Sequence, residues 1–122
     1  MRIDKLVKAT VAALEDVKAR DIVVLDVKKM TSLFDKVIIA SADSSRQSKA
    51  LSNSVREKLN ALGATIHGVE GERTGEWILV DLGVVVVHIM QPATRQYYNL
   101  EELWTPAGRR TRRRAGSARP AA

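Results

Sequence analysis

The sequence contains no cysteine. This absence excludes a disulfide framework, a thiolate nucleophile and a zinc site built on cysteine. No apolar run approaches the roughly 20 residues that span a bilayer. The first residues (MRID) lead directly into amphipathic sequence rather than into a secretion signal. We therefore expect a cytoplasmic protein.

Acidic residues are absent from positions 105–122, where six arginines lie: Arg109, Arg110, Arg112, Arg113, Arg114 and Arg119. Without these six, 14 Lys and Arg face 14 Asp and Glu, so the net charge of +6 belongs to this segment and residues 1–104 are neutral. A segment of Arg, Ala, Gly and Pro cannot bury a core. We predict one domain over residues 1–104 and a disordered basic tail over 105–122.

Aromatic residues are also scarce, five in all, and four of them lie between positions 77 and 104: Trp77, Tyr97, Tyr98 and Trp104. This concentration is consistent with a binding site anchored by aromatic rings. It is equally consistent with a C-terminal segment that is attached to the domain by its own aromatic side chains. The sequence leaves both interpretations open.

Apolar periodicity predicts the secondary structure. Apolar residues every three or four positions indicate amphipathic helices, and short aliphatic runs such as DIVVLDV indicate buried strands. The predicted elements are a helix over 3–19, strands over 21–27 and 35–42, a helix after residues 43–45 that ends near 62, strands over 65–69, 77–80 and 84–90, and helical turns over 93–98 and 100–104. This α-β-β-α-β-β-β order predicts an α/β protein with a five-stranded mixed sheet and two main helices on one face. The opposite face is then short of cover.

The stretch from 76 to 90 (EWILVDLGVVVVHIM) reads as a hairpin that is apolar on both faces, so both faces need cover. A two-residue turn at Leu82-Gly83 pairs Trp77 with His88; a three-residue turn ending in a bulge is the alternative. With the tight turn, one face is β-branched core. The other has the composition of a contact surface and carries Trp77, Leu79, Asp81, Val86, His88 and Met90.

Several residues are candidates for chemistry. His88 is a candidate general base if Asp81 or Glu76 orients it, although a hydrogen-bonded or partner-contacting histidine is the more common case. Asp26 and Asp81 are candidate ligands for a two-metal mechanism, but no two acids share one face of a strand, which favours structural or partner-binding roles. His67 has no metal-ligand spacing. We expect no metal and no cofactor.

The residues at 43–46 (DSSR) open a helix, and its first N–H groups are able to hold an anion. No Gly-rich loop or P-loop lysine accompanies them, and the glycines between 68 and 75 do not form a dinucleotide-binding fingerprint. Helix capping by a Ser or Asp side chain is therefore the favoured interpretation.

Several motifs occur together along residues 1–104: Lys18, 21–27 (DIVVLDV), Asp35, 44–47 (SSRQ), Glu70-Gly71, 77–83 (WILVDLG), 85–90 (VVVHIM), Arg95, Tyr98 and 100–104 (LEELW). In combination they resemble the ribosomal silencing factor family, also called the Iojap family. The Arg-rich tail lies outside these motifs. Members of the family commonly have Gly-Asp where this chain has Gly83-Val84, and Gly at the position of Ala42, so a carboxylate is missing at the hairpin tip.

The resemblance implies a nucleotidyltransferase-like fold that has lost catalysis, usually as a homodimer, so we expect no enzyme. It implies a translational repressor that docks on the fourteenth protein of the large ribosomal subunit and blocks subunit joining when nutrients are short. The tail arginines either contact ribosomal RNA phosphates or are solvated without function. A nucleotide-binding enzyme is the alternative. The expected partner-binding residues are Trp77, Leu79, Asp81, His88, Met90, Arg95 and Tyr98.

Overall fold

The structure is a computed structural model that describes residues 1–104. Its elements are α1 (Ile3–Asp16), β1 (Arg20–Asp26), β2 (Lys36–Ser41), α2 (Ser45–Ala61), β3 (Gly68–Glu70), β4 (Trp77–Asp81), β5 (Val85–Met90), α3 (Pro92–Tyr98) and α4 (Leu100–Leu103). The predicted order of elements is confirmed. The Arg-rich tail predicted for 105–122 lies outside the described residues. Within residues 1–104, no helix is long and apolar enough to cross a bilayer.

The five strands form one mixed sheet in the order β1-β2-β5-β4-β3. The central strands β2 and β5 are parallel, whereas β1, β4 and β3 add to them in antiparallel fashion. Both central strands are buried along nearly their whole length. Strands covered on both faces need apolar side chains at successive positions, which explains why the sequence around them does not alternate.

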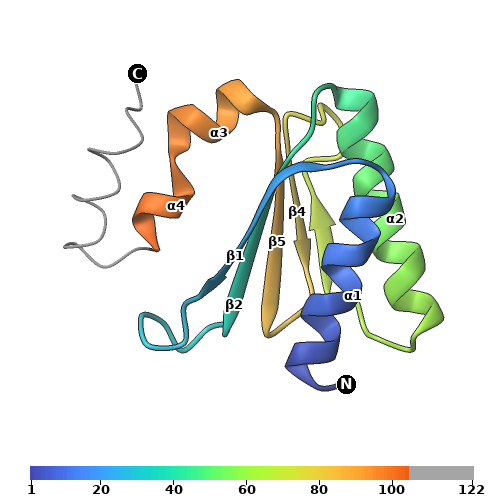
Figure 1. The fold of residues 1–122 in the computed structure, drawn as a ribbon, viewed down its shortest axis with the longest axis vertical. Helices are drawn as coiled ribbons and strands as arrows, with labels where there is room; N and C mark the ends of the chain where they lie inside the picture. The colour runs from blue at the N-terminus through green and yellow to red at the C-terminus, as the bar shows by residue number, and fades with distance from the viewer. Residues whose placement is uncertain (105–122) are drawn as a thin grey trace.

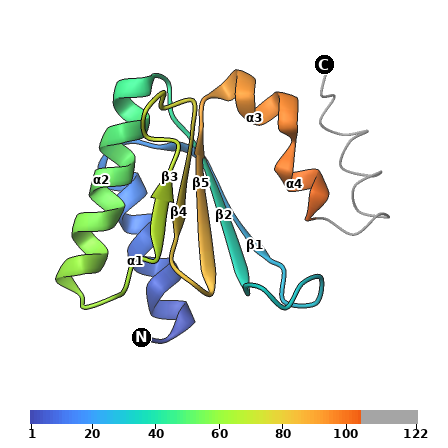
Figure 2. The same ribbon diagram turned by 180° about the vertical axis from the view of Figure 1, so that it is seen from behind.

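Helices lie on both faces of this sheet (Figure 1). α1 and α2 pack together on one face, where Leu14 and Leu51 join Ile78 and Val87 in the larger core. The prediction that these two helices share a face is confirmed. The opposite face is not bare: α3 and α4 lie against it (Figure 2), and a second core around the fully buried Met90 forms beneath them.

The turn of the β4–β5 hairpin lies one residue later than predicted. Leu82 N–H donates to Val85 O at 2.9 Å, so Gly83 and Val84 form the turn and His88 pairs with Leu79 rather than with Trp77. Leu82 is only 4% exposed and belongs to the larger core, which removes it from the turn. Gly83 has a φ of +90°, as the first central residue of a type II′ turn requires. Because the pairing shifts by two residues, each side chain keeps its predicted face.

Two further boundaries differ from the prediction. α1 ends at Asp16 rather than near residue 19, because Lys18 takes a left-handed conformation (φ 62°). Its N–H donates to Glu15 O at 3.0 Å, and Ala19 N–H donates to Leu14 O at 3.0 Å; such bonds close a helix end at a left-handed residue. The third strand is Gly68–Glu70, shorter and later than the predicted 65–69.

Candidate functional site

Trp77 and His88 meet on the face of the sheet that carries α3 and α4. They are diagonal neighbours on β4 and β5, since Trp77 pairs with Met90 and Leu79 pairs with His88. The indole Nε1–H of Trp77 donates to Nδ1 of His88 at 3.0 Å, and their ring centroids lie 5.9 Å apart. Both side chains are half-buried, so the bond fixes two rings at the edge of the solvent.

Burial lowers the pKa of His88 from 6.5 to about 4, because a partly desolvated imidazole disfavours its charged form. The ring is therefore neutral at pH 7, and Nδ1, as an acceptor, leaves the proton on Nε2. Neither Asp81 nor Glu76 orients this histidine as a general base would require. Asp81 Oδ1 instead accepts the N–H of Gly83 at 2.8 Å and supports the turn.

Two tyrosines of α3 continue the row of rings. Tyr98 lies 4.8 Å from Trp77, and Tyr97 meets Tyr98 edge to face at 4.9 Å. Tyr98 is 53% exposed and Tyr97 is 81% exposed. Together with Leu79 and His88 these residues form what we call the aromatic surface: Trp77, Leu79, His88, Tyr97 and Tyr98.

A hollow lies on each side of Trp77. The first, of about 350 Å³, is lined by Thr74, Glu76, Trp77, Ala93, Thr94, Tyr97 and Tyr98. The second, of about 260 Å³, is lined by Glu70, Gly71, Trp77, Leu79 and His88. Trp77 is the residue common to both, so its indole stands as a wall between two recesses of the surface.

The loop between β3 and β4 forms part of these recesses and is fastened to α2. Ser45 Oγ donates to Thr74 O at 2.8 Å, Ser48 Oγ donates to Gly75 O, and Arg56 pairs with Glu72. At Gly71 the loop passes so close to β4 that a Cβ would lie 2.0 Å from the carbonyl oxygen of Trp77. Only glycine fits at position 71, and this close approach of the loop supports the backbone of Trp77.

Arg95 attaches the C-terminal helices α3 and α4 to strands β1 and β2. It is 9% exposed, and its Nη1 donates to Asp21 O at 2.7 Å and to Ser41 Oγ at 2.8 Å. Its Nε and Nη2 donate to Glu101 Oε2 at 3.2 and 2.8 Å. Asp21 lies at an irregular point of β1 with a φ of 51°. One side chain thus joins α3, α4, β1 and β2, and it holds the helix that carries Tyr97 and Tyr98.

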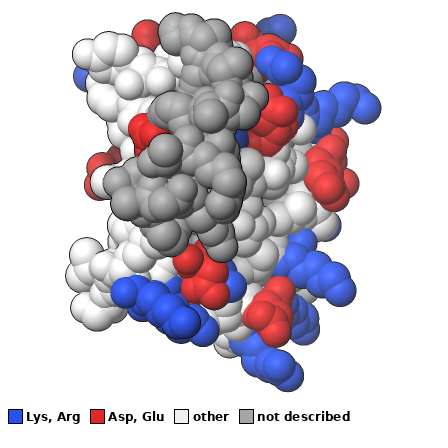
Figure 3. Space-filling model, turned by 60° about the vertical axis from the view of Figure 1, so that its left-hand side comes forward, with Lys and Arg blue, Asp and Glu red and all other residues white. Residues whose placement is uncertain are grey.

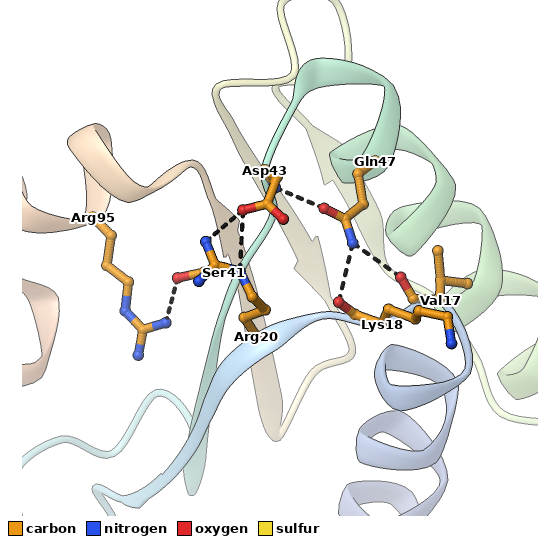
Figure 4. A network of polar contacts seen from close by, with 7 residues as sticks. All are labelled: Val17, Lys18, Arg20, Ser41, Asp43, Gln47 and Arg95. Atoms are coloured by element: carbon orange, nitrogen blue, oxygen red, sulfur yellow. Dashed lines mark hydrogen bonds and ion pairs between the residues drawn. The ribbon is translucent and has the colours of Figure 1, made fainter.

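The start of α2 is capped by Ser44, as predicted, and Figure 4 shows the contacts of Gln47 and Asp43 beside this cap. Ser44 Oγ accepts the N–H of Gln47 at 3.1 Å, and the Gln47 side chain accepts the N–H of Asp43 at 2.7 Å while donating to Lys18 O at 3.1 Å. The Asp43 carboxylate pairs with Arg20. The carboxylate of Asp43 therefore lies beside the N-terminal end of α2. The contacts of Asp43 with Arg20 and of Gln47 with Lys18 O tie α2 to the α1–β1 connection.

The chain matches the family described as ribosomal silencing factor during starvation over residues 1–121. It belongs to the ribosomal silencing factor family. The ribosomal silencing factor RsfS of Chromobacterium violaceum is 50% identical over 120 residues, 98% of this chain and 97% of that protein. A crystal structure of a protein from Chromobacterium violaceum is similar with a TM-score of 0.84 at 52% identity, over 87% of this chain and 91% of that one. The mouse protein named mitochondrial assembly of ribosomal large subunit protein 1 is 34% identical over 78% of this chain and 43% of its own length.

The resemblance found in the sequence is confirmed, and the family match extends to residue 121, beyond residues 1–104 over which the motifs lie. Membership of this family also bears on the enzyme alternative. The ribosomal silencing factor family is associated with the ribosome and with silencing of translation, and it is not a known enzyme family. Asp26 ends β1 and Asp81 ends β4, and two strands lie between β1 and β4 in the sheet. Three inter-strand spacings separate the two strands by roughly 14 Å. A hydrogen bond from the Lys28 N–H lowers the pKa of Asp26, and Lys36 Nζ lies 3.3 Å from its carboxylate. No group of three His, Asp or Glu side chains within 1–104 is placed to hold a metal ion.

The seven predicted contact residues fall into two groups. Trp77, Leu79, Asp81 and His88 are half-buried and Tyr98 is exposed, all on the predicted side of the hairpin. Met90 is fully buried and Arg95 nearly so, so in this structure both support the surface from within. Tyr97 was not among the predicted contact residues, although its position among the clustered aromatic residues of the sequence could have indicated it. Glu70 and Glu76, which line the hollows, were not among the predicted contact residues either, although Glu70-Gly71 matches a family motif and Glu76 was a candidate partner of His88.

Proposed function

We propose that this chain docks on the fourteenth protein of the large ribosomal subunit through its aromatic surface and thereby blocks joining of the small subunit under nutrient limitation. Membership of the ribosomal silencing factor family supports the association with the ribosome. The family's description, which mentions starvation, supports the link to nutrients. The name of the mouse relative supports the large subunit as the site of action. The place of action would be the cytoplasm.

The observation that carries the proposal is the position of Trp77. Its indole is half-buried, hydrogen-bonded to His88, in contact with Tyr98 and flanked by two hollows. Binding energy at protein interfaces concentrates in preordered aromatic anchors of this kind. The proposed contact set is Trp77, Leu79, Asp81, His88, Tyr97 and Tyr98, with Met90 and Arg95 as the residues that hold it in place.

Co-sedimentation with purified large subunits tests the docking site. Replacement of an interface anchor by alanine costs roughly 2 kcal/mol or more, so Trp77→Ala should bind about 30-fold more weakly. Leu33→Ala is the matched control, because Leu33 is an apolar side chain that is 77% exposed in the β1–β2 connection. Urea unfolding of both variants verifies that they are folded. Equal binding of folded Trp77→Ala and wild type would show that the site is elsewhere.

The block to subunit joining has its own measurement. Large subunits are incubated with the protein, small subunits are added, and formation of the joined ribosome is followed on sucrose gradients. The wild-type chain should reduce joining in proportion to its occupancy of the large subunit, and Trp77→Ala should not. Unimpaired joining with fully occupied large subunits would refute the block while leaving the docking site intact.

We also propose a homodimer that uses the first strands or the helices, so that the aromatic surface is left to the ribosome. Val24 on the edge strand β1 is 42% exposed, an apolar side chain that a second copy would cover. Light scattering should give the mass of two chains for the wild type and for Trp77→Ala, and a lower mass for Val24→Lys. The mass of one chain for the wild type would exclude the dimer.

A last proposal concerns the arginines between 109 and 119, which would add a weak contact with ribosomal RNA. Each phosphate that a protein neutralises steepens the dependence of affinity on salt. Replacing the six arginines by glutamine in the full chain should therefore lower the salt dependence of large-subunit binding. An unchanged salt slope would assign these arginines no part in the contact.

A further inference from the structure

The surface around Trp77 is acidic, although the chain as a whole carries a net charge of +6. Glu76 lines one hollow and Glu70 lines the other, and no Lys or Arg lines either. In Figure 3, Lys and Arg alternate with Asp and Glu along the right side and the lower end, and the upper left part is mostly uncharged. The recesses beside Trp77 therefore have a charge opposite to that of the whole chain.

The hollow next to α3 combines this charge with aromatic walls. Trp77, Tyr97 and Tyr98 line it together with Glu76. The ring of Tyr98 contacts that of Trp77 at a centroid distance of 4.8 Å and that of Tyr97 at 4.9 Å. The faces of such rings attract cations, and tryptophan does so most strongly. A nearby carboxylate adds Coulombic attraction for the same charge.

We propose that this hollow receives a lysine or arginine side chain of the ribosomal protein on which the chain docks. The proposal rests on the docking function proposed above and specifies the chemistry of its partner. The cation would lie against the rings, within reach of Glu76, and its aliphatic stem would cover apolar ring edges. Recognition at Trp77 is then selective for a basic segment of a protein.

The same chemistry argues against nucleic acid at this surface. Phosphates need Lys, Arg or backbone N–H groups as partners, and the carboxylates of Glu70, Glu76 and Asp81 repel them. The basic residues nearest along the chain do not change this conclusion. Arg73 lines neither hollow, and the guanidinium of Arg95 is engaged by Glu101, Asp21 and Ser41.

A small cation tests the hollow in the free, full-length chain. n-Butylguanidinium chloride is titrated against the ¹⁵N-labelled protein, with sodium chloride at equal ionic strength as reference. The indole N–H signal of Trp77 should shift in a saturable manner, whereas that of Trp104, which packs on Phe34, should not. Glu76→Gln should weaken the response about threefold, and Tyr97→Leu should weaken it more than Tyr97→Phe, which keeps the ring.

Binding to large subunits tests the same hollow in the complex. Glu76→Gln should lower the affinity about three- to fivefold and reduce its salt dependence. The matched control is Glu57→Gln, which removes the same charge from an exposed position on α2 and should leave the affinity unchanged. Tyr97 is 81% exposed, so its replacement keeps the fold and the comparison stays interpretable.

The outcomes separate this inference from the docking proposal. If the wild type does not sediment with large subunits, the docking proposal fails, and the cation titration still decides the chemistry of the hollow. If the wild type binds but Glu76→Gln behaves like Glu57→Gln, the cation site is wrong while docking stands. A Trp77 signal that does not respond to the cation also overturns the inference. Tighter binding by Glu76→Gln together with competition by protein-free ribosomal RNA would overturn it in favour of nucleic acid.

Discussion

Arg95 and Arg56 allow a matched test of what holds the aromatic surface in place. Arg95 Nη2 lies 2.8 Å from Glu101 Oε2, with side-chain exposures of 11% and 20%. Arg56 Nη1 lies 2.9 Å from Glu72 Oε2, with exposures of 39% and 39%. The two ion pairs have nearly the same length, but the Arg95 pair is more buried, and Arg95 also donates to Asp21 O and Ser41 Oγ. Burial and these additional hydrogen bonds should therefore make Arg95 contribute more stability than Arg56.

Replacing Arg95 by methionine keeps most of its apolar stem but leaves the carboxylate of Glu101 without this arginine and removes the donors to Asp21 O and Ser41 Oγ. Breaking a buried pair by removal of one partner costs about 3–5 kcal/mol. Since Glu101 retains 20% exposure, we expect the lower end, about 3 kcal/mol. Arg56→Met breaks a solvated pair and should cost at most about 1 kcal/mol.

Urea unfolding of the two variants measures this difference directly. Arg95→Met should lower the unfolding midpoint well below that of Arg56→Met, with similar m-values. Arg95→Lys should lie between wild type and Arg95→Met, because an ammonium keeps the charge but cannot reproduce the fork of donors. Equal losses for the methionine variants of Arg95 and Arg56 would refute the assignment of Arg95 as the central fastening of α3 and α4.

Three further changes follow from backbone geometry and from burial. Gly71→Ala should lower the free energy of unfolding in urea by about 3 kcal/mol, because the added Cβ would lie 2.0 Å from Trp77 O. Gly63→Ala is the control: Gly63 also has a positive φ but no atom within 4 Å of the added Cβ, so this variant should cost about 1 kcal/mol. Lys18→Gly should raise the same free energy by about 0.5–1 kcal/mol, since glycine adopts the left-handed conformation found there without strain. The pKa of His88 falls from 6.5 to about 4 on folding, so between these pH values the unfolded chain binds one proton at His88 that the folded chain does not. The free energy of unfolding should therefore decline by about 3 kcal/mol as the pH falls from 6.5 to 4. Urea titrations of His88→Gln should lack this decline.

The hairpin shows which features a sequence determines robustly. The turn was predicted at Leu82-Gly83 and lies at Gly83-Val84, yet the core face and the outer face of both strands were assigned correctly. Side chains alternate with a period of two, so a pairing error of two residues preserves the faces whereas an error of one would exchange them. The apolar pattern alone carried enough information for the face, but the burial of Leu82, which selects the turn, depends on contacts across the domain.

The role of Arg95 illustrates what the sequence could not provide. Its hydrogen bond to Asp21 O spans 74 positions of the chain, and its acceptor is a backbone oxygen at an irregular point of β1, so no residue type marks the site. Arg95 was predicted as a contact residue because it matches a motif of the family. The motif is equally consistent with a role of Arg95 in binding a partner and with a role in stabilising the fold. Only the burial of the Arg95 side chain distinguishes these two roles.

Trp77 belongs both to the second core and to the walls of both hollows, so stability and docking are coupled at this residue. Its replacement by alanine removes an anchor and also opens the core around Met90, and weaker binding alone would not tell the two effects apart. Tyr97 offers the separation, because it lines a hollow while 81% of its surface is exposed. A variant that changes binding at Tyr97 without changing the free energy of unfolding therefore identifies the aromatic surface as a site for a partner rather than as a support of the fold.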